Sequence, residues 1–178
     1  MKPLQSVAMG LVIVALVARL DGYDLLPDPV GWALVLHGVR RLPNLPWPGA
    51  VRFLCWLALV VSVFLWFPAV PDALADTDAS LEWAGSLPQV AAVGTVCAAL
   101  ARLAEEAGDR RARAWLRTAC TLVVLTGIAP AVVLAAEPGA VGAMLTLGVV
   151  TIVLVIVLLF RYAARPWAVP LVDQTSTG

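Results

Sequence analysis

Long, almost uncharged apolar stretches are the feature that most constrains how this chain can fold. A hydrocarbon core of roughly 30 Å is crossed by about 20 apolar residues of α-helix. Four stretches meet that length, and a fifth, Leu81–Leu103, is rich in alanine and interrupted by Pro88. All five are predicted to be transmembrane helices. The four clearest stretches are Leu4–Leu20, Val51–Val70, Leu116–Ala136 and Ala140–Tyr162.

The overall composition argues against a soluble domain of this length. Hydrophobic residues make up 61% of the 178 residues and charged residues only 13%, whereas an ordinary globular chain is about half apolar and about a quarter charged. A folded soluble domain of roughly 150 residues still exposes about a third of the surface that its unfolded chain exposes. So much apolar surface could not be hidden from water, and the excess needs lipid. The formal net charge is zero, which gives no long-range field toward nucleic acid. The expected partner is therefore the lipid bilayer.

A sixth segment, Leu25–Leu42, is shorter than the others. Its regular helix is predicted to start near Pro29, because Asp28 is a good N-cap and proline suits the first helical turn. From Pro29 to Leu42 such a helix is about 21 Å long at 1.5 Å per residue. That length is less than a full crossing.

The positions of the basic residues decide whether this short helix crosses. With the N-terminus in the cytoplasm and six crossings, eleven of the twelve basic residues fall inside and only Arg19 falls outside, in agreement with the positive-inside rule. The seven tryptophans lie at or near segment ends, where the indole ring favours the headgroup region. The sequence predicts six crossings of a bacterial cytoplasmic membrane with both termini inside. The inner basic residues are Lys2, Arg40, Arg41, Arg52, Arg102, Arg110, Arg111, Arg113, Arg117, Arg161 and Arg165.

These observations predict an all-α fold, an integral membrane bundle of six transmembrane helices with a short second helix. Residues 1–165 form a single domain, because no loop is long enough for a folded domain outside the membrane. Residues 166–178 are expected to form a flexible cytoplasmic tail, since the last residues are polar.

The entry turn and the short helix, residues 24–42, form the most distinctive segment. Gly31 and Gly38 are seven residues apart and share one helix face, so a second helix can approach closely there. Arg40 and Arg41 can snorkel to the inner headgroups. The candidate functional motif consists of Asp24, Pro27, Asp28, Gly31, His37, Gly38, Arg40 and Arg41.

At this segment the chain resembles a family of small multi-pass bacterial membrane proteins of unknown function. Those proteins carry a D-x-L-P-D-x-x-G motif at the start of the second helix, followed by a second glycine and a basic pair. His37 departs from the pattern, in which its position is usually apolar. The resemblance covers about one helix and its entry turn, and it implies a membrane fold and location without an established activity. The matching residues are Asp24, Leu26, Pro27, Asp28, Gly31, Gly38, Arg40, Arg41 and Leu42.

His37 is the only histidine, and it has two interpretations. Its place one turn from the basic exit favours an interfacial side chain, whereas an ionisable residue inside the membrane is a candidate proton relay. No second histidine and no carboxylate lies three or four residues away, so we expect no metal site. The relay interpretation lacks the partners that such sites normally need.

Three aspartates cluster at the outer end of the first two segments. Asp28 suits a helix cap, and Asp21 and Asp24 suit solvated charges. The alternative is a weak site for a cation or a cationic substrate. Their spacing does not match an EF-hand, which favours the cap.

Two further patterns have structural explanations. Four arginines between Arg110 and Arg117 fit an inner loop that sets the topology, with attraction to anionic lipid headgroups as an addition. The small residues of Leu81–Leu103 favour tight packing between helices of the chain, or a seam between two copies.

We therefore expect a non-enzymatic membrane protein that packs with itself, with lipid or with a membrane protein partner. No catalytic, cofactor-binding or metal-binding set is expected. The alternative is a small transporter or channel for an ion or small solute, lined by the first two segments and gated near Asp28 and His37. A transporter usually has polar groups near mid-bilayer, and few occur here. They are mainly Ser62, Thr95, Thr126, Thr146 and Thr151.

Overall fold

The computed structural model describes residues 1–169 except for 17–18, 21–22, 25–27, 67–78 and 134–140. The described residues form six α-helices, one short 3-10 helix and a pair of two-residue strands. The all-α fold class is therefore confirmed apart from this strand pair. The elements are α1 (Pro3–Ala15), β1 (Arg19–Leu20), β2 (Tyr23–Asp24), α2 (Asp28–Arg40), α3 (Pro48–Leu65), α5 (Ala79–Glu106), α6 (Arg110–Val133), α7 (Val141–Tyr162) and η2 (Pro166–Ala168).

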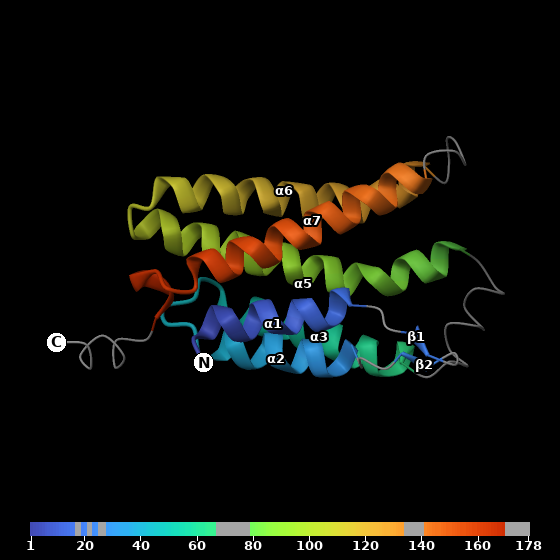
Figure 1. Ribbon diagram of the computed structural model, residues 1–178, viewed down its shortest axis with the longest axis horizontal. Coiled ribbons are helices and arrows are strands. Elements are labelled where there is room, and N and C mark those ends of the chain that lie inside the picture. Colours follow the sequence, from blue (N-terminus) through green and yellow to red (C-terminus); the bar gives the residue numbers. More distant parts are fainter. Residues whose placement is uncertain (17–18, 21–22, 25–27, 67–78, 134–140, 170–178) are drawn as a thin grey trace.

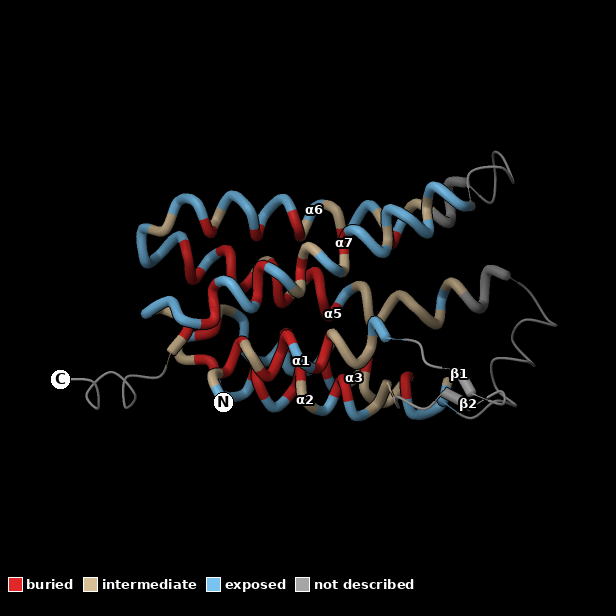
Figure 2. The backbone as a smooth tube through the Cα atoms, viewed as in Figure 1, coloured by how far each residue is buried: buried red, intermediate tan, exposed pale blue. Residues whose placement is uncertain are grey.

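Successive helices run in opposite directions and pack side by side (Figure 1). The first half of the bundle is α1, α2 and α3, and the second half is α5, α6 and α7. Contacts of α3 with α5 and of α7 with α1 join the halves, so the series of neighbour contacts closes on itself. Figure 2 shows that the buried residues face the interior and that α5 carries many of them. The core is therefore the axis of a closed six-helix bundle.

Four of the described helices are long and apolar enough to cross a membrane. For three of the four clearest stretches and for the alanine-rich fifth, the prediction of a helix long and apolar enough to cross a membrane is confirmed. The first stretch, Leu4–Leu20, is only partly helical, because α1 ends at Ala15. The long helices are Pro48–Leu65, Trp83–Glu106, Arg110–Ala129 and Gly142–Tyr162.

A small strand pair follows α1 where the sequence was expected to continue as helix. Leu20 pairs with Tyr23 and Arg19 with Asp24 in antiparallel register. Two residues, Asp-Gly, lie between the paired strands in the sequence, and this dipeptide at this spacing is the strongest short-range signal for a β-hairpin. Counting apolar residues missed that signal.

The helix α2 agrees with the prediction for the short segment. It begins at Asp28 and ends at Arg40, within two residues of the expected bounds. Its 13 residues give about 20 Å of helix, and α1 has the same length. The bundle therefore combines two short helices with four long ones.

Glycines bring α1 and α2 into backbone contact, as the glycine face predicted. A Cβ atom added to Gly31 would lie 2.7 Å from Gly10 O, and one added to Gly38 would lie 2.6 Å from Pro3 O. Real Cβ atoms do not approach backbone atoms so closely, so only glycine permits this packing. Ser6 Oγ also donates a hydrogen bond of 3.0 Å to the carbonyl oxygen of Leu34. The closely approaching helix is thus α1.

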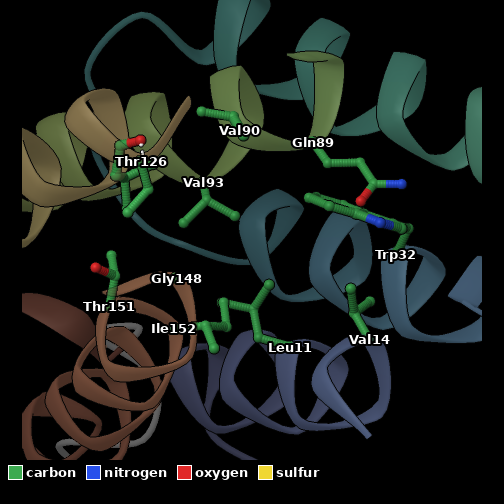
Figure 3. Close-up of a pocket in the computed structure, with 11 residues that line it drawn as sticks. Leu11, Val14, Trp32, Gln89, Val90, Val93, Thr126, Gly148, Thr151 and Ile152 are labelled. Atoms are coloured by element: carbon green, nitrogen blue, oxygen red, sulfur yellow. Dashed lines mark hydrogen bonds between the residues drawn. The ribbon is translucent and has the colours of Figure 1, made fainter. Parts of the chain in front are cut away.

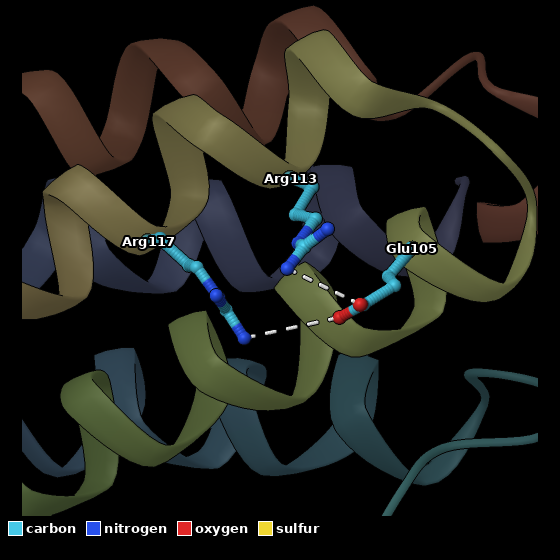
Figure 4. A network of polar contacts seen from close by, with 3 residues as sticks. All are labelled: Glu105, Arg113 and Arg117. Atoms are coloured by element: carbon cyan, nitrogen blue, oxygen red, sulfur yellow. Dashed lines mark ion pairs between the residues drawn. The ribbon is translucent and has the colours of Figure 1, made fainter.

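The turn between α5 and α6 is much shorter than the expected arginine-rich loop. Gly108 has a φ of +73°, and Asp109 Oδ1 accepts a 3.0 Å hydrogen bond from the backbone N–H of Ala112. This cap starts α6 at Arg110, so the four arginines lie on the first turns of a helix rather than in a loop. Figure 4 shows Glu105 paired with both Arg113 and Arg117, and the N–O distances are 3.2 Å and 3.9 Å.

Candidate functional site

The residues of the sequence motif are not gathered into one site. Gly31 and Gly38 lie inside the contact between α1 and α2. His37, Arg40 and Arg41 are exposed and lie outside that contact. Their separation supports a packing role for the glycines.

The acidic end of the motif is described only in part. Asp28 is half-buried at the start of α2, where its charge favours the positive end of the helix. Asp24 is described as a β2 backbone residue. Pro27 and Asp21 lie outside the described residues. Where the structure describes the chain, no group of three or more His, Cys, Asp or Glu side chains is placed to hold a metal ion.

A cavity of about 180 Å³ lies where five helices meet. Figure 3 shows its wall, to which α1, α2, α5, α6 and α7 all contribute. The cavity lies toward the end of the bundle where α1 ends and α2 begins. Its lining residues are Leu11, Val14, Trp32, Gln89, Val90, Val93, Val123, Thr126, Gly148, Thr151 and Ile152.

Two polar groups in this wall have no hydrogen-bond partner. Trp32 is 1% exposed and Thr151 is 3% exposed, and both Trp32 Nε1 and Thr151 Oγ1 are unpaired within the described structure. Trp32 was expected near the headgroups at a segment end, yet it is the largest fully buried side chain in the bundle. A buried polar group without a partner costs stability and calls for an explanation.

Several comparable groups elsewhere in the bundle are paired. Trp83 Nε1 donates a 2.8 Å hydrogen bond to the carbonyl oxygen of Gly127, which links α5 to α6. The other described threonines donate to carbonyl oxygens of their own helix. These are Thr95, Thr118, Thr121, Thr126 and Thr146. Among the described residues, Tyr162 Oη and Trp167 Nε1 are also buried without a partner, so Trp32 and Thr151 are the two such groups that line this cavity.

Beyond the cavity the bundle axis is closed by apolar side chains. A space of about 10 Å³ adjoins the cavity there and is lined by valines from four helices together with Leu11 and Trp32. A void of that size holds at most about one water molecule. The valines are Val7, Val35, Val93, Val96 and Val155.

The small residues of α5 have two surroundings. Ala92 and Ala99 are fully buried within the bundle, and a Cβ atom added to Gly94 would meet Val123 of α6 at 3.6 Å. Ala91 is exposed and lines a shallow groove of about 440 Å³ between α5 and α6. Most of the small-residue face therefore packs within the chain.

Sequence reasoning missed two of the residues that carry polar groups in the cavity wall, Trp32 and Gln89. Gln89 is the one amide side chain in the apolar stretch Leu81–Leu103, and that isolation was the available signal. Trp32 gave no such signal, because its burial depends on helices far away in the sequence. Thr126 and Thr151 were noted as polar residues near mid-bilayer, and the structure places both in this wall.

No family model matches the sequence, and neither a curated protein nor a solved structure is significantly similar to it.

Proposed function

We propose that this protein is a non-enzymatic, six-crossing protein of the bacterial inner membrane, with both termini in the cytoplasm, and that it acts by binding within the bundle. The resemblance of the Asp24–Leu42 segment to small multi-pass bacterial membrane proteins is part of the same proposal. Apolar helices of sufficient length are compatible with a membrane location. Binding suits the cavity wall, whose lining residues offer hydroxyl, amide and indole groups among apolar side chains.

The observation that supports this topology most directly is the placement of basic residues at one end of the bundle. The ends of α2, α5 and α7 and the starts of α1, α3 and α6 lie together (Figure 1). Every lysine and arginine side chain that the structure describes belongs to these ends or to the short segments beside them. A cytoplasmic position for that end satisfies the positive-inside rule.

The two short helices are the feature that a six-crossing arrangement must accommodate. Both α1 and α2 have 13 residues, about 10 Å less helix than a hydrocarbon core of roughly 30 Å requires. Lys2 at one end of α1 and Arg40 and Arg41 at the end of α2 can snorkel to headgroups. Local thinning of the bilayer at modest cost covers the remainder.

Cysteine accessibility in cells tests the crossings. In a background without Cys55, Cys97 and Cys120, a single cysteine is introduced by Leu16→Cys, Gly49→Cys or Gly142→Cys. Leu16 is exposed, and an added Cβ at Gly49 or Gly142 meets nothing within 4 Å.

A membrane-impermeant maleimide should label the Leu16→Cys and Gly142→Cys variants in intact spheroplasts. The Gly49→Cys variant should react only after permeabilisation. Labelling of the Gly49→Cys variant from outside, together with the Leu16→Cys variant, would mean that α2 does not cross.

A transporter is the second candidate, and the cavity on the bundle axis favours it. A much smaller space of about 10 Å³ among the valines adjoins the cavity of about 180 Å³, an arrangement compatible with a pathway closed on one side. Val35 and Val155 are two of the valines that line the smaller space. Replacing either by threonine, which has a similar shape but is polar, should then raise the flux of small neutral solutes into proteoliposomes. Unchanged flux in both variants would count against a pathway along this axis.

A further inference from the structure

The cavity lined by Trp32 and Thr151 has the properties of a ligand site. We propose that it binds a small neutral molecule whose apolar part is about the size of a six-membered carbon ring. Oxygen acceptors on this molecule would receive hydrogen bonds from Trp32 Nε1 and Thr151 Oγ1. This inference rests on the proposed binding role and names the class of ligand.

The size of the cavity sets the size of the ligand. An apolar cavity of roughly 150 Å³ holds one benzene molecule, and this cavity measures about 180 Å³. A six-membered carbon ring with one or two small substituents therefore fits. Leu11, Val93 and Ile152 contribute apolar side chains to the wall, which suits the carbon skeleton.

The chemistry of the wall makes the ligand neutral. None of the lining residues carries an ionisable side chain. A charged ligand would lose its hydration without gaining a partner, which is costly inside a membrane protein. A neutral molecule avoids that cost.

The unpaired polar groups make the ligand a hydrogen-bond acceptor. The indole N–H can only donate, and a threonine hydroxyl can donate and accept, so an oxygen acceptor satisfies both. Figure 3 shows Trp32 and Gln89 at one end of the cavity and Thr126 and Thr151 at the other. A ring with an acceptor oxygen at each end matches this arrangement. Both unpaired atoms have almost no accessible surface in this structure, so the proposed ligand reaches them only when side chains of the wall move.

The chain offers a matched control for Thr151. Thr126 lines the same cavity, but its hydroxyl already donates to the carbonyl oxygens of Leu122 and Val123, at 3.0 Å and 2.9 Å. Thr151 has no such partner. At either position, Thr→Val replaces the hydroxyl by a methyl group and keeps the side-chain volume similar. Of the two hydroxyls, only that of Thr151 lacks a partner within the described part of the protein and can donate to a ligand.

The test uses a pair of probes of one shape, para-cyclohexanedione and para-dimethylcyclohexane. The full chain is placed in lipid nanodiscs with ¹⁵N-labelled tryptophan, and the indole N–H resonance of Trp32 is assigned with Trp32→Phe. The diketone should shift that resonance saturably, and the oxygen-free probe should not. Thr151→Val should weaken the affinity for the diketone about tenfold, the effect of one hydrogen bond, while Thr126→Val should leave it within about twofold.

The possible failures separate this inference from the binding role. Equal binding of both probes, with both Thr→Val variants unchanged, would overturn the hydrogen-bonding ligand class and leave an apolar binding cavity in place. No response to either probe would overturn the ligand site and the binding role together. Equal losses in the Thr126→Val and Thr151→Val variants would overturn the assignment of Thr151.

Discussion

The α1–α2 pair and the α5–α6 pair hold their helices together in different ways. In the first pair the helices have 13 residues each and touch through backbone atoms at Gly10, Gly31 and Gly38. In the second pair the helices have 28 and 24 residues, and the glycines Gly94 and Gly127 face valine side chains rather than backbone atoms of the other helix. Lipid supplies no hydrophobic driving force between helices, so short helices with few side-chain layers gain most from close backbone approach. Longer helices can be held together by many side-chain contacts, each of which contributes little.

The largest expected effect separates backbone contact from side-chain contact. Gly38→Ala should lower the free energy of unfolding by about 3 kcal/mol, because its Cβ would lie 2.6 Å from Pro3 O. Gly127→Ala should cost less, about 1 to 2 kcal/mol, because its Cβ meets only side-chain atoms of Val90, the nearest at 2.5 Å, and no backbone atom has to move. Reversible unfolding in mixed micelles measures both.

Gly94→Ala is the control for this pair of variants. Its Cβ would meet Val123 at an ordinary 3.6 Å, so removing a helix glycine should be neutral or stabilise by about 0.5 kcal/mol. If all three alanine variants lose equal stability, the distinction between the two helix pairs is wrong.

The next effect concerns the hydrogen bond that links α5 to α6. Trp83→Phe removes the donor to the Gly127 carbonyl oxygen at 2.8 Å and should cost about 1 kcal/mol. Trp56→Phe, at a half-exposed position on α3, should change stability much less in the same unfolding assay. Equal losses would indicate that ring size, rather than the hydrogen bond, accounts for the effect.

A smaller effect is expected for the polar link between α1 and α2. Ser6→Ala removes the 3.0 Å hydrogen bond to the Leu34 carbonyl oxygen, and side-chain hydrogen bonds between membrane helices average about 0.6 kcal/mol. Ser62→Ala is the matched control, since Ser62 is equally buried but bonds to Leu59 in its own helix. A loss of stability confined to the Ser6→Ala variant would support glycine packing reinforced by one polar contact.

The smallest expected effect is at the turn of the α5–α6 pair. Glu105→Gln removes ion pairs to Arg113 and Arg117, whose side chains are partly exposed, so the loss should be a few tenths of a kcal/mol. Raising the salt concentration to about 1 M shortens the screening length to about 3 Å and should remove the difference. A thermal unfolding series in increasing salt measures this, and a difference that persists at high salt would contradict the electrostatic cause.

The elements that the sequence predicted well depend on local patterns. Asp28 and Pro29 placed the start of α2, and the spacing of Gly31 and Gly38 placed its contact face, because caps and helix periodicity act within a few residues. The end of α1 was misplaced for an equally local reason. The Asp-Gly dipeptide between the β strands indicates a turn, whereas the apolar composition of the stretch indicated a continuous helix.

The cavity could not be predicted, because its wall is assembled from distant parts of the chain. Trp32, Gln89 and Thr151 lie on three helices and share no sequence pattern. Whether a hydroxyl such as that of Thr151 bonds to its own helix or remains unpaired depends on the packing around it. Polar residue types in the stretches could be listed from the sequence, but their meeting point could not.

The contact between α7 and α1 has a consequence for how the protein is made. The ribosome releases α1 well before α7, so during synthesis of the intervening helices the side of α1 that will face α7 has only lipid or the insertion machinery against it. The glycine contacts let α1 and α2 form a compact unit during that interval. The cavity wall, which needs α7 for Gly148, Thr151 and Ile152, is completed only after α7 has been synthesised and has packed against the bundle. A ligand of the proposed kind therefore meets its complete site only after α7 is in place.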